Sequence, residues 1–312
     1  MSLIVSRSSG NAAADRRFAW GVGASAAGEH AEAAELFAQT LEIAPGFAAA
    51  AFAQGLAWQE CGDADAAARG FRLALKLDPR DEQGAALHLA RMGAGAVPPA
   101  APQAYVRELF DAYAPGFDAH LSGALGYRAP QVLLDMVLET RWPQPFPGQG
   151  QPLTTILDLG CGTGLSGAAF RKLASHLTGV DLSPGMIALA QAKGIYDRLA
   201  VADIAGFLDG EPPASAGLIL AADVFVYIGE LAGIFRACCL VLPPGGILAF
   251  TVQKSDESIT FGEDMRYGHS VSYITQTARA AGLTVRSHLE TSTRRDRGRD
   301  VRGLCFVLVR AE

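Results

Sequence analysis

The chain has 312 residues, which is more than one compact core usually holds, so we expect two domains. Half of the residues are hydrophobic (50%) and 19% are charged, a composition that excludes disordered, collagen-like and coiled-coil chains. With 26 Lys and Arg against 32 Asp and Glu, the formal net charge of -6 argues against nucleic acid or an anionic membrane surface as a partner.

The start of the chain and its cysteines predict a cytoplasmic protein. The only apolar patch among the first ten residues, 3–5, is too short for the core of a signal peptide. The five cysteines form no Cys-x-x-Cys pair, so we predict neither a disulfide framework nor a zinc site, and we expect no metal. The most apolar stretch, 217–235, is interrupted by Asp223 and Glu230 and is not predicted to span a bilayer.

The first third of the chain repeats with a period of 34 residues. Five pairs stand at this spacing: Gly21 and Gly55, Gly28 and Gly62, Ala33 and Ala67, Phe37 and Phe71, and Pro45 and Pro79. The pattern resembles two tetratricopeptide repeats, at 14–47 and 48–81. Because a solenoid needs about three repeats, we expect a helix over 82–91 to cap the stack and complete a domain at 14–92. The resemblance implies either a groove for a protein partner or a surface for docking and self-association, and both interpretations stay open.

A linker and a helical segment follow the repeats. Residues 93–103 are low in charge and rich in Ala, Gly and Pro, which is typical of an extended linker. Helical spacing then relates four apolar residues, Tyr105, Leu109, Phe110 and Tyr113, and residues 129–138 predict a second amphipathic helix. We expect residues 104–145 to form a helical lid, with a second Pro- and Gly-rich linker at 142–152.

From residue 153 to 312, short apolar runs alternate with helical stretches. Seven runs are predicted strands: 154–159, 177–180, 199–201, 218–222, 247–252, 283–289 and 304–309. This alternation predicts an α/β domain with a doubly wound, mostly parallel sheet that helices cover on both faces. Such sheets bind ligands at the carboxyl ends of their strands, near the point where the strand order reverses.

The first of these strands runs into a glycine-rich turn. The segment Asp158-Leu-Gly-Cys-Gly-Thr-Gly164 has small residues where a helix is expected to begin, which lets the backbone approach a ligand. Asp181 ends the second strand, 21 positions beyond Gly160, where a carboxylate can accept both hydroxyls of an adenosine ribose. Nicotinamide enzymes share both features. However, Leu165 takes the place of the last glycine of the dinucleotide fingerprint.

Residues 156–164 strongly resemble the first motif of the class I S-adenosylmethionine (SAM)-dependent methyltransferases. Four further segments between 105 and 310 match this superfamily in order: 179–183 for the ribose, 201–204 for the adenine, 220–223 facing the donor, and 242–246 entering the fifth strand. Three others, 112–118, 126–130 and 183–186, resemble its small-molecule branch, which includes the methyltransferase of the Williams-Beuren chromosomal region. The resemblance implies a Rossmann-like, seven-stranded methyltransferase sheet and SAM as the cofactor.

The resemblance also assigns donor-binding residues position by position. It places four loop residues beneath the methionine part of SAM: Gly160, Cys161, Gly162 and Gly164. Asp158 is assigned to the ammonium of SAM. The other assignments are Asp181 and Leu182 for the ribose, Met186, Asp203 and Ile204 for the adenine, and Ala222 for the wall near the sulfonium. Met186 has a second interpretation, as an ordinary core residue.

Three residues outside these motifs are further candidates for donor contacts. The aromatic faces of Tyr113 and Phe117 attract a sulfonium, as they attract other cations. Arg128 is expected to make a forked contact with the donor carboxylate. Ordinary packing for the two rings, and solvation for the arginine, are the alternative interpretations.

An oxygen or nitrogen acceptor must lose a proton when it takes the methyl group. His269 follows the fifth strand and precedes a helix, which makes it the candidate for an acceptor contact or a catalytic base; a helix cap at Ser270 is the other explanation of this segment. We predict a small molecule or a protein side chain as acceptor, because the fourth strand lacks the Pro-Pro-aromatic signature of amino-directed DNA methyltransferases. Two other functions stay open: a repeat scaffold with a non-catalytic nucleotide-binding fold, and a NAD-type oxidoreductase.

Overall fold

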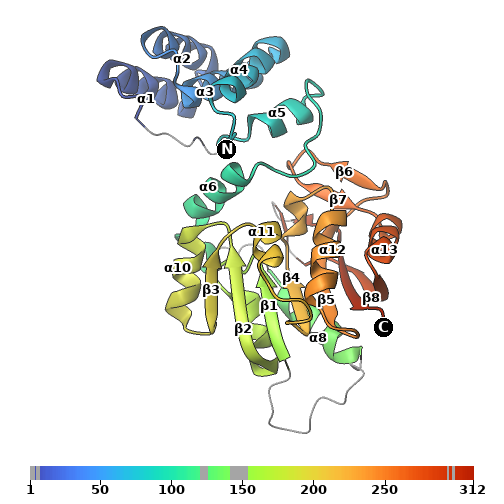
Figure 1. The fold of residues 1–312 in the computed structure, drawn as a ribbon. Helices are drawn as coiled ribbons and strands as arrows, with labels where there is room; N and C mark the ends of the chain where they lie inside the picture. The colour runs from blue at the N-terminus through green and yellow to red at the C-terminus, as the bar shows by residue number, and fades with distance from the viewer. Residues whose placement is uncertain (1–3, 5–7, 120–125, 141–153, 294, 297–298) are drawn as a thin grey trace. The chain divides into compact units, whose positions relative to one another are not determined.

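The computed structural model describes residues 4, 8–119, 126–140, 154–293, 295–296 and 299–312 (Figure 1). The chain forms two compact units, Met1–Leu109 and Phe110–Glu312. The division falls inside helix α6 (Gln103–Tyr113), just after the linker predicted at 93–103. The first unit is helical, and the second contains all the strands that the structure describes.

Two consecutive helix pairs form most of the first unit. Helices α1 (Ala12–Ala26) and α2 (His30–Ile43) make the first pair, and α3 (Ala48–Glu60) and α4 (Ala64–Leu77) make the second. Helix α1 begins two residues before the first repeat predicted from the sequence. The reason is a cap, because the Asn11 side chain accepts hydrogen bonds from the backbone N–H groups of Ala13 and Ala14.

In each pair, the two helices pack closely where a glycine of the first faces an aromatic ring of the second. A Cβ added to Gly21 would stand 2.6 Å from the ring of Phe37, and one added to Gly55 would stand 2.8 Å from the ring of Phe71. A side chain at either glycine would push the two helices apart. The period of 34 residues therefore corresponds to the same packing contact made twice.

The capping helix is shorter than the predicted 82–91. Helix α5 spans Ala85–Arg91 and begins three residues later than expected. The carboxylate of Asp81 accepts hydrogen bonds from the N–H groups of Ala85 at 2.6 Å and Ala86 at 3.0 Å, so it fixes the first turn of the helix. Asp81 itself has a left-handed φ of 54° and Gly84 one of 74°, which keeps residues 81–84 in a turn.

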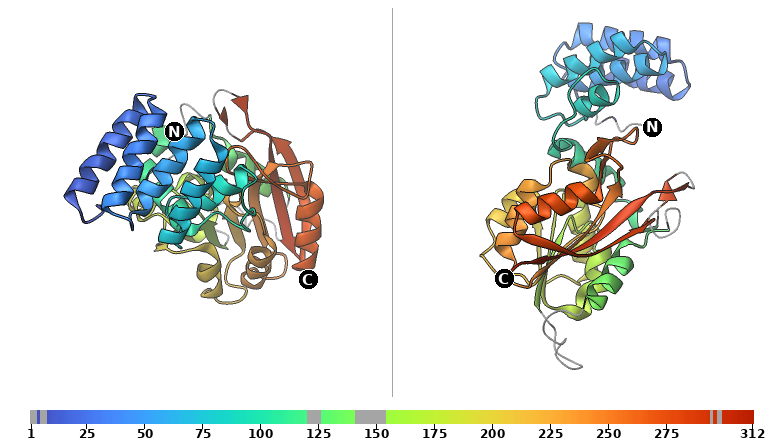
Figure 2. Two further views of the ribbon diagram at one scale, coloured as in Figure 1. Left: turned by 90° about the horizontal axis from the view of Figure 1, so that it is seen from above. Right: turned by 90° about the vertical axis from the view of Figure 1, so that its right-hand side faces the viewer.

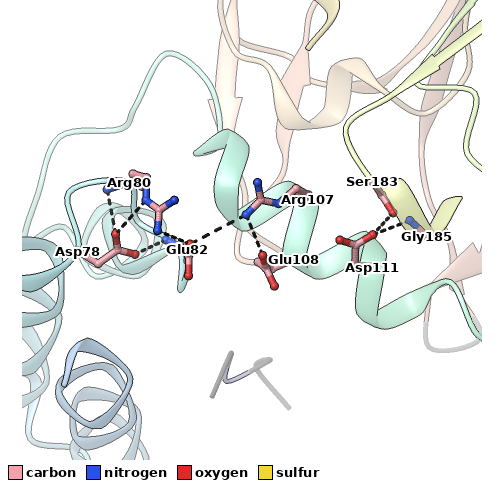
Figure 3. Close-up of polar contacts among 8 residues, drawn as sticks. All are labelled: Asp78, Arg80, Glu82, Arg107, Glu108, Asp111, Ser183 and Gly185. Atoms are coloured by element: carbon pink, nitrogen blue, oxygen red, sulfur yellow. Dashed lines mark hydrogen bonds and ion pairs between the residues drawn. The ribbon is translucent and has the colours of Figure 1, made fainter. Parts of the chain in front are cut away.

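Charged side chains hold the start of α6 to this turn (Figure 3). Arg80 Nη2 lies 2.7 Å from Glu82 Oε1, and Arg107 Nη2 lies 4.0 Å from the same oxygen. Asp78 accepts the backbone N–H of Glu82 at 2.8 Å. Arg107 belongs to α6, so the first turns of this helix join the helical unit.

The seven strands predicted from apolar runs are all present. They are β1 (Thr154–Leu159), β2 (Ala174–Asp181), β3 (Arg198–Val201), β4 (Leu218–Ala221), β5 (Ile247–Lys254), β8 (Leu283–Thr291) and β11 (Gly303–Arg310). Their order is β3-β2-β1-β4-β5-β11-β8, with the first five parallel and β11 antiparallel to both neighbours (Figure 1). The order reverses between β1 and β4, so the expected binding position lies where these two strands end.

The prediction of a seven-stranded sheet is corrected to nine strands within the described residues. Two short strands, β6 (Ile259–Phe261) and β7 (Tyr267–His269), pair antiparallel, and β7 pairs parallel with the last residues of β5. Three residues are too few to form an apolar run, so no sequence pattern indicated them. A separate two-stranded ribbon, β9 (Arg295–Asp296) and β10 (Arg299–Asp300), lies between β8 and β11.

Helices cover both faces of the sheet (Figure 2), and alternate residues of the strands pack against them. One face, with Leu248 and Phe250, is covered by α11 (Ile204–Asp209), α12 (Ala232–Val241) and α13 (Val271–Ala280). The other, with Ile247 and Ala249, is covered by α8 (Ala129–Glu139) and α9 (Leu165–Phe170). The remaining elements are α10 (Pro184–Lys193) beside β2 and β3, and the 3-10 turns η2 (Arg171–Leu173) and η3 (Phe225–Tyr227).

The segment predicted as a lid divides between two roles. Helix α8 buries Leu133 and Val137 completely and forms part of the sheet's cover. The end of α6 and the short helix α7 (Phe117–Ala119) lie near the glycine loop instead, as described below. Residues 120–125 and 141–145 of the predicted lid, and the predicted linker at 142–152, lie outside the described residues.

None of the described helices has the length and apolar character needed to cross a membrane. The described ranges also contain no group of three or more His, Cys, Asp or Glu side chains placed to hold a metal ion. The five cysteines are all free thiols.

Candidate active site

A loop of left-handed glycines follows β1. Gly160, Gly162 and Gly164 have φ angles of 64°, 53° and 94°, which residues with a Cβ rarely adopt. The loop is fixed to β2, because the N–H of Cys161 donates to the carbonyl oxygen of Val180 at 2.9 Å. Helix α9 begins directly after the loop, at Leu165.

The three glycines differ in what surrounds them. A Cβ on Gly160 would stand 2.5 Å from Val224 Cγ2, and one on Gly164 would stand 2.9 Å from the ring of Tyr196. A Cβ on Gly162 would meet only Phe117 Cε1, at 3.8 Å. The middle of the loop therefore exposes bare backbone, which is what a closely approaching ligand requires.

Asp181, at the end of β2, holds this loop. Its Oδ2 accepts the N–H of Gly162 at 2.9 Å, and its Oδ1 accepts the N–H of Ser183 at 2.9 Å. Burial raises the pKa of Asp181, against the effect of these two hydrogen bonds. The structure thus brings together two of the residues predicted to bind the donor, and Leu182, partly exposed, lies between them and α10.

Asp158 lies beneath the loop rather than on its surface. Its side chain is 1% exposed, and its Oδ2 accepts the hydroxyl of Tyr196 at 2.6 Å. Burial raises the pKa of Asp158 to about 7, opposed by the Tyr196 hydrogen bond and reinforced by the charge of Asp181.

The residues predicted for the adenine lie on two elements after β2 and β3. Met186 is fully buried in α10, in agreement with its alternative interpretation as a core residue. Asp203 caps α11 by accepting the N–H of Gly206 at 2.9 Å, and the side chain of Ile204 packs against the core. The N–H of Ala202 donates to the backbone oxygen of Asp181 at 3.1 Å, which keeps this segment beside the end of β2.

Helix α7 is bound to the donor loop through Asp118. Lys193 Nζ lies 2.5 Å from Asp118 Oδ2, and the hydroxyl of Thr163 donates to Asp118 Oδ1. Burial raises the pKa of Asp118, but the hydrogen bonds from Lys193 and Thr163 outweigh burial, so the net effect is a lowered pKa. The neighbouring Phe117 lies next to Gly162, whereas Tyr113 is 52% exposed at the end of α6.

A second acid binds the end of α6 to the start of α10 (Figure 3). Asp111 Oδ1 accepts the Ser183 hydroxyl at 2.5 Å and the N–H of Gly185 at 2.9 Å. The Ser183 hydroxyl oxygen in turn accepts the N–H of Met186 at 3.0 Å and caps α10. Asp111 and Asp118 together hold the lid segment across the carboxyl ends of β1 and β2.

Asp223 stands at the carboxyl end of β4 with a left-handed φ of 57°. Its backbone N–H donates to the Thr251 hydroxyl oxygen at 2.8 Å, and that hydroxyl donates to Asp223 Oδ1 at 3.0 Å. Such a conformation is strained in a residue other than glycine and is retained where the surroundings enforce it, often at functional sites. The preceding residue, Ala222, is partly buried beside it.

Aromatic rings line up from the lid toward this strand end. The ring centroids of Phe110 lie 6.2 Å from Phe117 and 5.5 Å from Tyr227, both edge to face. The guanidinium of Arg266 lies 5.9 Å from the centroid of Tyr227. These rings form a series from the glycine loop to the guanidinium of Arg266, on which the charge of Asp223 acts.

Two of the predicted site residues are hydrogen-bonded to other parts of the chain. Arg128 donates its N–H to the carbonyl of Thr293 at 2.9 Å and its guanidinium to that of Ser292 at 3.2 Å, so it binds the chain after β8 rather than the donor loop. His269 is fully buried, with Nε2 2.9 Å from the carbonyl oxygen of Gly229. Its Nδ1 has no hydrogen-bond partner among the described residues, and burial lowers the pKa of this histidine. Ser270 caps α13, as the alternative explanation held.

Comparison with known proteins identifies the domain. Residues 157–250 match a family model described as a methyltransferase domain. The chain is 33% identical over 162 residues to human methyltransferase-like protein 27, covering 49% of this chain and 60% of that protein. It is 30% identical over 104 residues to a ubiquinone biosynthesis O-methyltransferase of Xanthomonas campestris pv. campestris, covering 31% and 42% of the two chains. It therefore spans less than two thirds of these curated relatives.

Solved structures with this fold include enzymes of different names. The cyclase SpnF aligns with a TM-score of 0.54 at 18% identity, covering 68% of this chain and 98% of that one. Burkholderia thailandensis 1,6-didemethyltoxoflavin-N1-methyltransferase was solved with bound 1,6-didemethyltoxoflavin and S-adenosylhomocysteine. It aligns with a TM-score of 0.51 at 17% identity, covering 69% of this chain and 93% of that one. At these identities the similarity concerns the fold alone. Residues 157–250 thus resemble a methyltransferase domain, and the α/β unit has a fold that a solved methyltransferase shares.

Sequence analysis missed four polar residues of this site: Asp111, Asp118, Thr163 and Tyr196. Asp111 lies 72 positions before its partner Ser183, and Asp118 lies 45 positions before its partner Thr163, so no local spacing relates them. Tyr196 offered a weak signal, as an aromatic residue standing alone between Gly194 and the third strand.

Proposed function

We propose that this protein is a SAM-dependent methyltransferase that transfers a methyl group to an oxygen or nitrogen atom of a small molecule or a protein side chain. The observation that carries the proposal is the contact between Asp181 and Gly162, in the segment that matches the methyltransferase model. The names of the curated relatives support methyl transfer, and those of ubiquinone biosynthesis favour an oxygen atom as acceptor.

The residues at the loop fit SAM. A carboxylate has about four lone-pair positions, and Asp181 has used two of them on backbone N–H groups, so it keeps capacity for ribose hydroxyls. The open backbone at Gly162 admits the methionine part, and the ring of Phe117 beside it offers a face to a cation. SAM supplies a methyl group already activated by its sulfonium, so the protein's task is alignment, exclusion of water and removal of a proton.

We assign the acceptor to the strand ends beside Asp223. Thr251 holds one oxygen of this carboxylate, which gives it the fixed geometry that a proton acceptor needs. Phe110 and Tyr227 offer ring edges and faces to a flat apolar acceptor. Burial lowers the pKa of Arg266, but nearby groups that include Tyr227 and Asp223 outweigh burial, so this guanidinium stays charged.

We further infer that the helical unit consists of two tetratricopeptide repeats that bind a protein partner or a second copy of the chain. The ring pairs Phe18–Phe37 and Phe52–Phe71 support this, because both have centroids 5.4 Å apart at nearly the same angle. A hollow of about 390 Å³ beside the exposed Trp20 offers a place for the partner. If the chain associates with itself, we expect Trp20→Ala to lower the molecular mass measured by light scattering. A mass equal to that of the wild type would favour a different protein as the partner.

The motif pattern also supports two finer proposals. Segments 112–118 and 183–186 favour membership of the small-molecule branch that includes the methyltransferase of the Williams-Beuren region. The five free thiols support a reducing compartment such as the cytoplasm.

Calorimetry tests the proposed function directly. The full chain is titrated with SAM, with S-adenosylhomocysteine and with NADH. We expect heat and a thermal shift with the first two only. Binding of NADH alone would support the oxidoreductase interpretation, and binding of none would support a non-catalytic scaffold. Radiolabelled SAM with a fractionated lysate then shows whether the label enters protein, lipid or small solutes.

A further inference from the structure

Tyr196 lies beneath the donor loop in a space left by three glycines. A Cβ on Gly164, Gly167 or Gly179 would stand 2.9, 2.3 or 2.9 Å from an atom of Tyr196. These glycines belong to the loop, to α9 and to β2, so one ring contacts all three elements that converge on the site. Any larger residue at these positions would displace the ring.

The hydroxyl of Tyr196 is hydrogen-bonded to the buried carboxyl group of Asp158. It donates to Asp158 Oδ2 at 2.6 Å, and the backbone N–H of Gly167 also interacts with this carboxylate. Two other groups face the pair: Asp181 from β2 and the thiol of Cys161 from the loop. Burial raises the pKa of that thiol, so it stays neutral, whereas Asp181 adds to the effect of burial on the pKa of Asp158.

We propose that Tyr196 is a positioning residue of the donor site, whose ring supports the glycine loop from below and whose hydroxyl holds the Asp158 carboxylate under Gly160 to Gly164. This inference rests on the proposed function. When it is ionised, the Asp158 carboxylate below the loop attracts the cationic end of SAM across bare backbone, where little water screens it. The hydroxyl suits this role because burial and the Asp158 charge raise the pKa of Tyr196, so it remains a hydrogen-bond donor.

The sign of the pH dependence follows from these contacts. The Tyr196 hydrogen bond lowers the pKa of Asp158, which burial has raised to about 7. Donor affinity should therefore fall as pH falls through this value and the carboxylate takes up a proton. Without the hydroxyl the pKa of Asp158 rises further, so the affinity is lost at a higher pH.

The test measures the Kd of S-adenosylhomocysteine by calorimetry between pH 5.5 and 9 on the full chain. We expect Tyr196→Phe to raise the Kd about tenfold at pH 7, as for a lost hydrogen bond to a charged group, and to move the midpoint of the pH dependence upward. Asp158→Asn should remove the transition. The matched control is Tyr273→Phe, which removes a hydroxyl that accepts the N–H of Leu231 at 2.9 Å, and should change neither quantity.

Three outcomes would overturn the proposal. An unchanged Kd in Tyr196→Phe removes the hydroxyl from the site. An equal loss at every pH, with the midpoint unmoved, reduces Tyr196 to a packing residue. A wild-type transition that persists in Asp158→Asn assigns it to another group, and this variant decides the matter even if Tyr196→Phe does not fold. Wild-type protein that binds no S-adenosylhomocysteine at all contradicts the proposed function itself, which separates that failure from the other three.

Discussion

The backbone N–H of Gly162 donates to Asp181 Oδ2 at 2.9 Å. Asp181 ends β2, and this hydrogen bond holds the glycine loop that follows the neighbouring strand, β1. The register of β1 and β2 produces this contact, because Leu159 pairs with Val180 immediately before the loop and the acid begin. The loop conformation is therefore set before a ligand arrives, which reduces the entropy lost on binding.

Replacing Asp181 tests this arrangement. We expect Asp181→Ala to weaken the binding of SAM by about 1 to 3 kcal/mol, because the ribose hydroxyls and the Gly162 N–H lose their acceptor. Asp181→Asn keeps one acceptor oxygen and should lose less. Calorimetry measures both variants, and an affinity equal to that of wild type would remove Asp181 from the donor site.

Asp118 holds α7 against the loop, so its removal should loosen the lid. We expect Asp118→Ala to speed the dissociation of S-adenosylhomocysteine in stopped-flow measurements and to change the unfolding temperature little, because the pair with Lys193 is partly exposed. Glu290→Ala is the matched control, since it breaks a partly exposed pair of similar length, which joins Glu290 on β8 to Lys254 on β5. Equal dissociation rates in the two variants would contradict the role of Asp118.

His269 can be tested as a base against its place in the interior. Because burial lowers its pKa and its ring is packed against Gly229, we expect His269→Asn to reduce stability by about 1 to 3 kcal/mol and to leave the shape of the pH–rate profile unchanged. Thermal unfolding and initial rates from pH 5.5 to 9 measure these quantities. Loss of the acidic limb of the profile, with stability intact, would restore the catalytic assignment.

Replacing either of two glycines in the helical unit with alanine should change its stability, in opposite directions for the two positions. A Cβ on Gly70 would stand 2.7 Å from the backbone nitrogen of Gly55, and backbone cannot move aside, so Gly70→Ala should destabilise the unit by about 1 to 3 kcal/mol. Gly23 in α1 has nothing within 4 Å of such a Cβ, so Gly23→Ala should stabilise it by about 0.5 to 1 kcal/mol. Hydrogen exchange in α1 to α4 measures both, and effects of the same sign would contradict the packing described.

His88 makes the helical unit sensitive to acid. Burial against Phe52 and Phe71, together with the charge of Arg91, lowers the pKa of His88 to about 3, from 6.5 for a free histidine. Below pH 6.5 the unfolded chain gains a proton that the folded unit does not, so stability falls as pH falls from 6.5 toward 3. From pH 7 to pH 5 the loss should be about 2 kcal/mol, and His88→Leu should remove it. Hydrogen exchange of the α5 amides measures this loss of stability. An equal loss in His88→Leu would assign the acid sensitivity to another group.

Much of the fold could be predicted because its patterns are local. The seven longer strands follow from continuous apolar runs, and the repeat period follows from small and aromatic residues that recur 34 positions apart. The short strands β6 and β7 could not be predicted, because three-residue strands depend on pairing with β5 rather than on their own composition.

The same division holds at the site. The amino-acid sequence by itself determined the glycine loop and the acid at the end of β2, because left-handed turns need glycine and Asp181 directly follows the apolar run of its strand. Only the tertiary structure decided that Asp158 is buried under the loop, that Tyr196 holds it, and that His269 lies inside the core. Burial and long-range hydrogen bonds join residues far apart in the chain, and no spacing along one sequence encodes them.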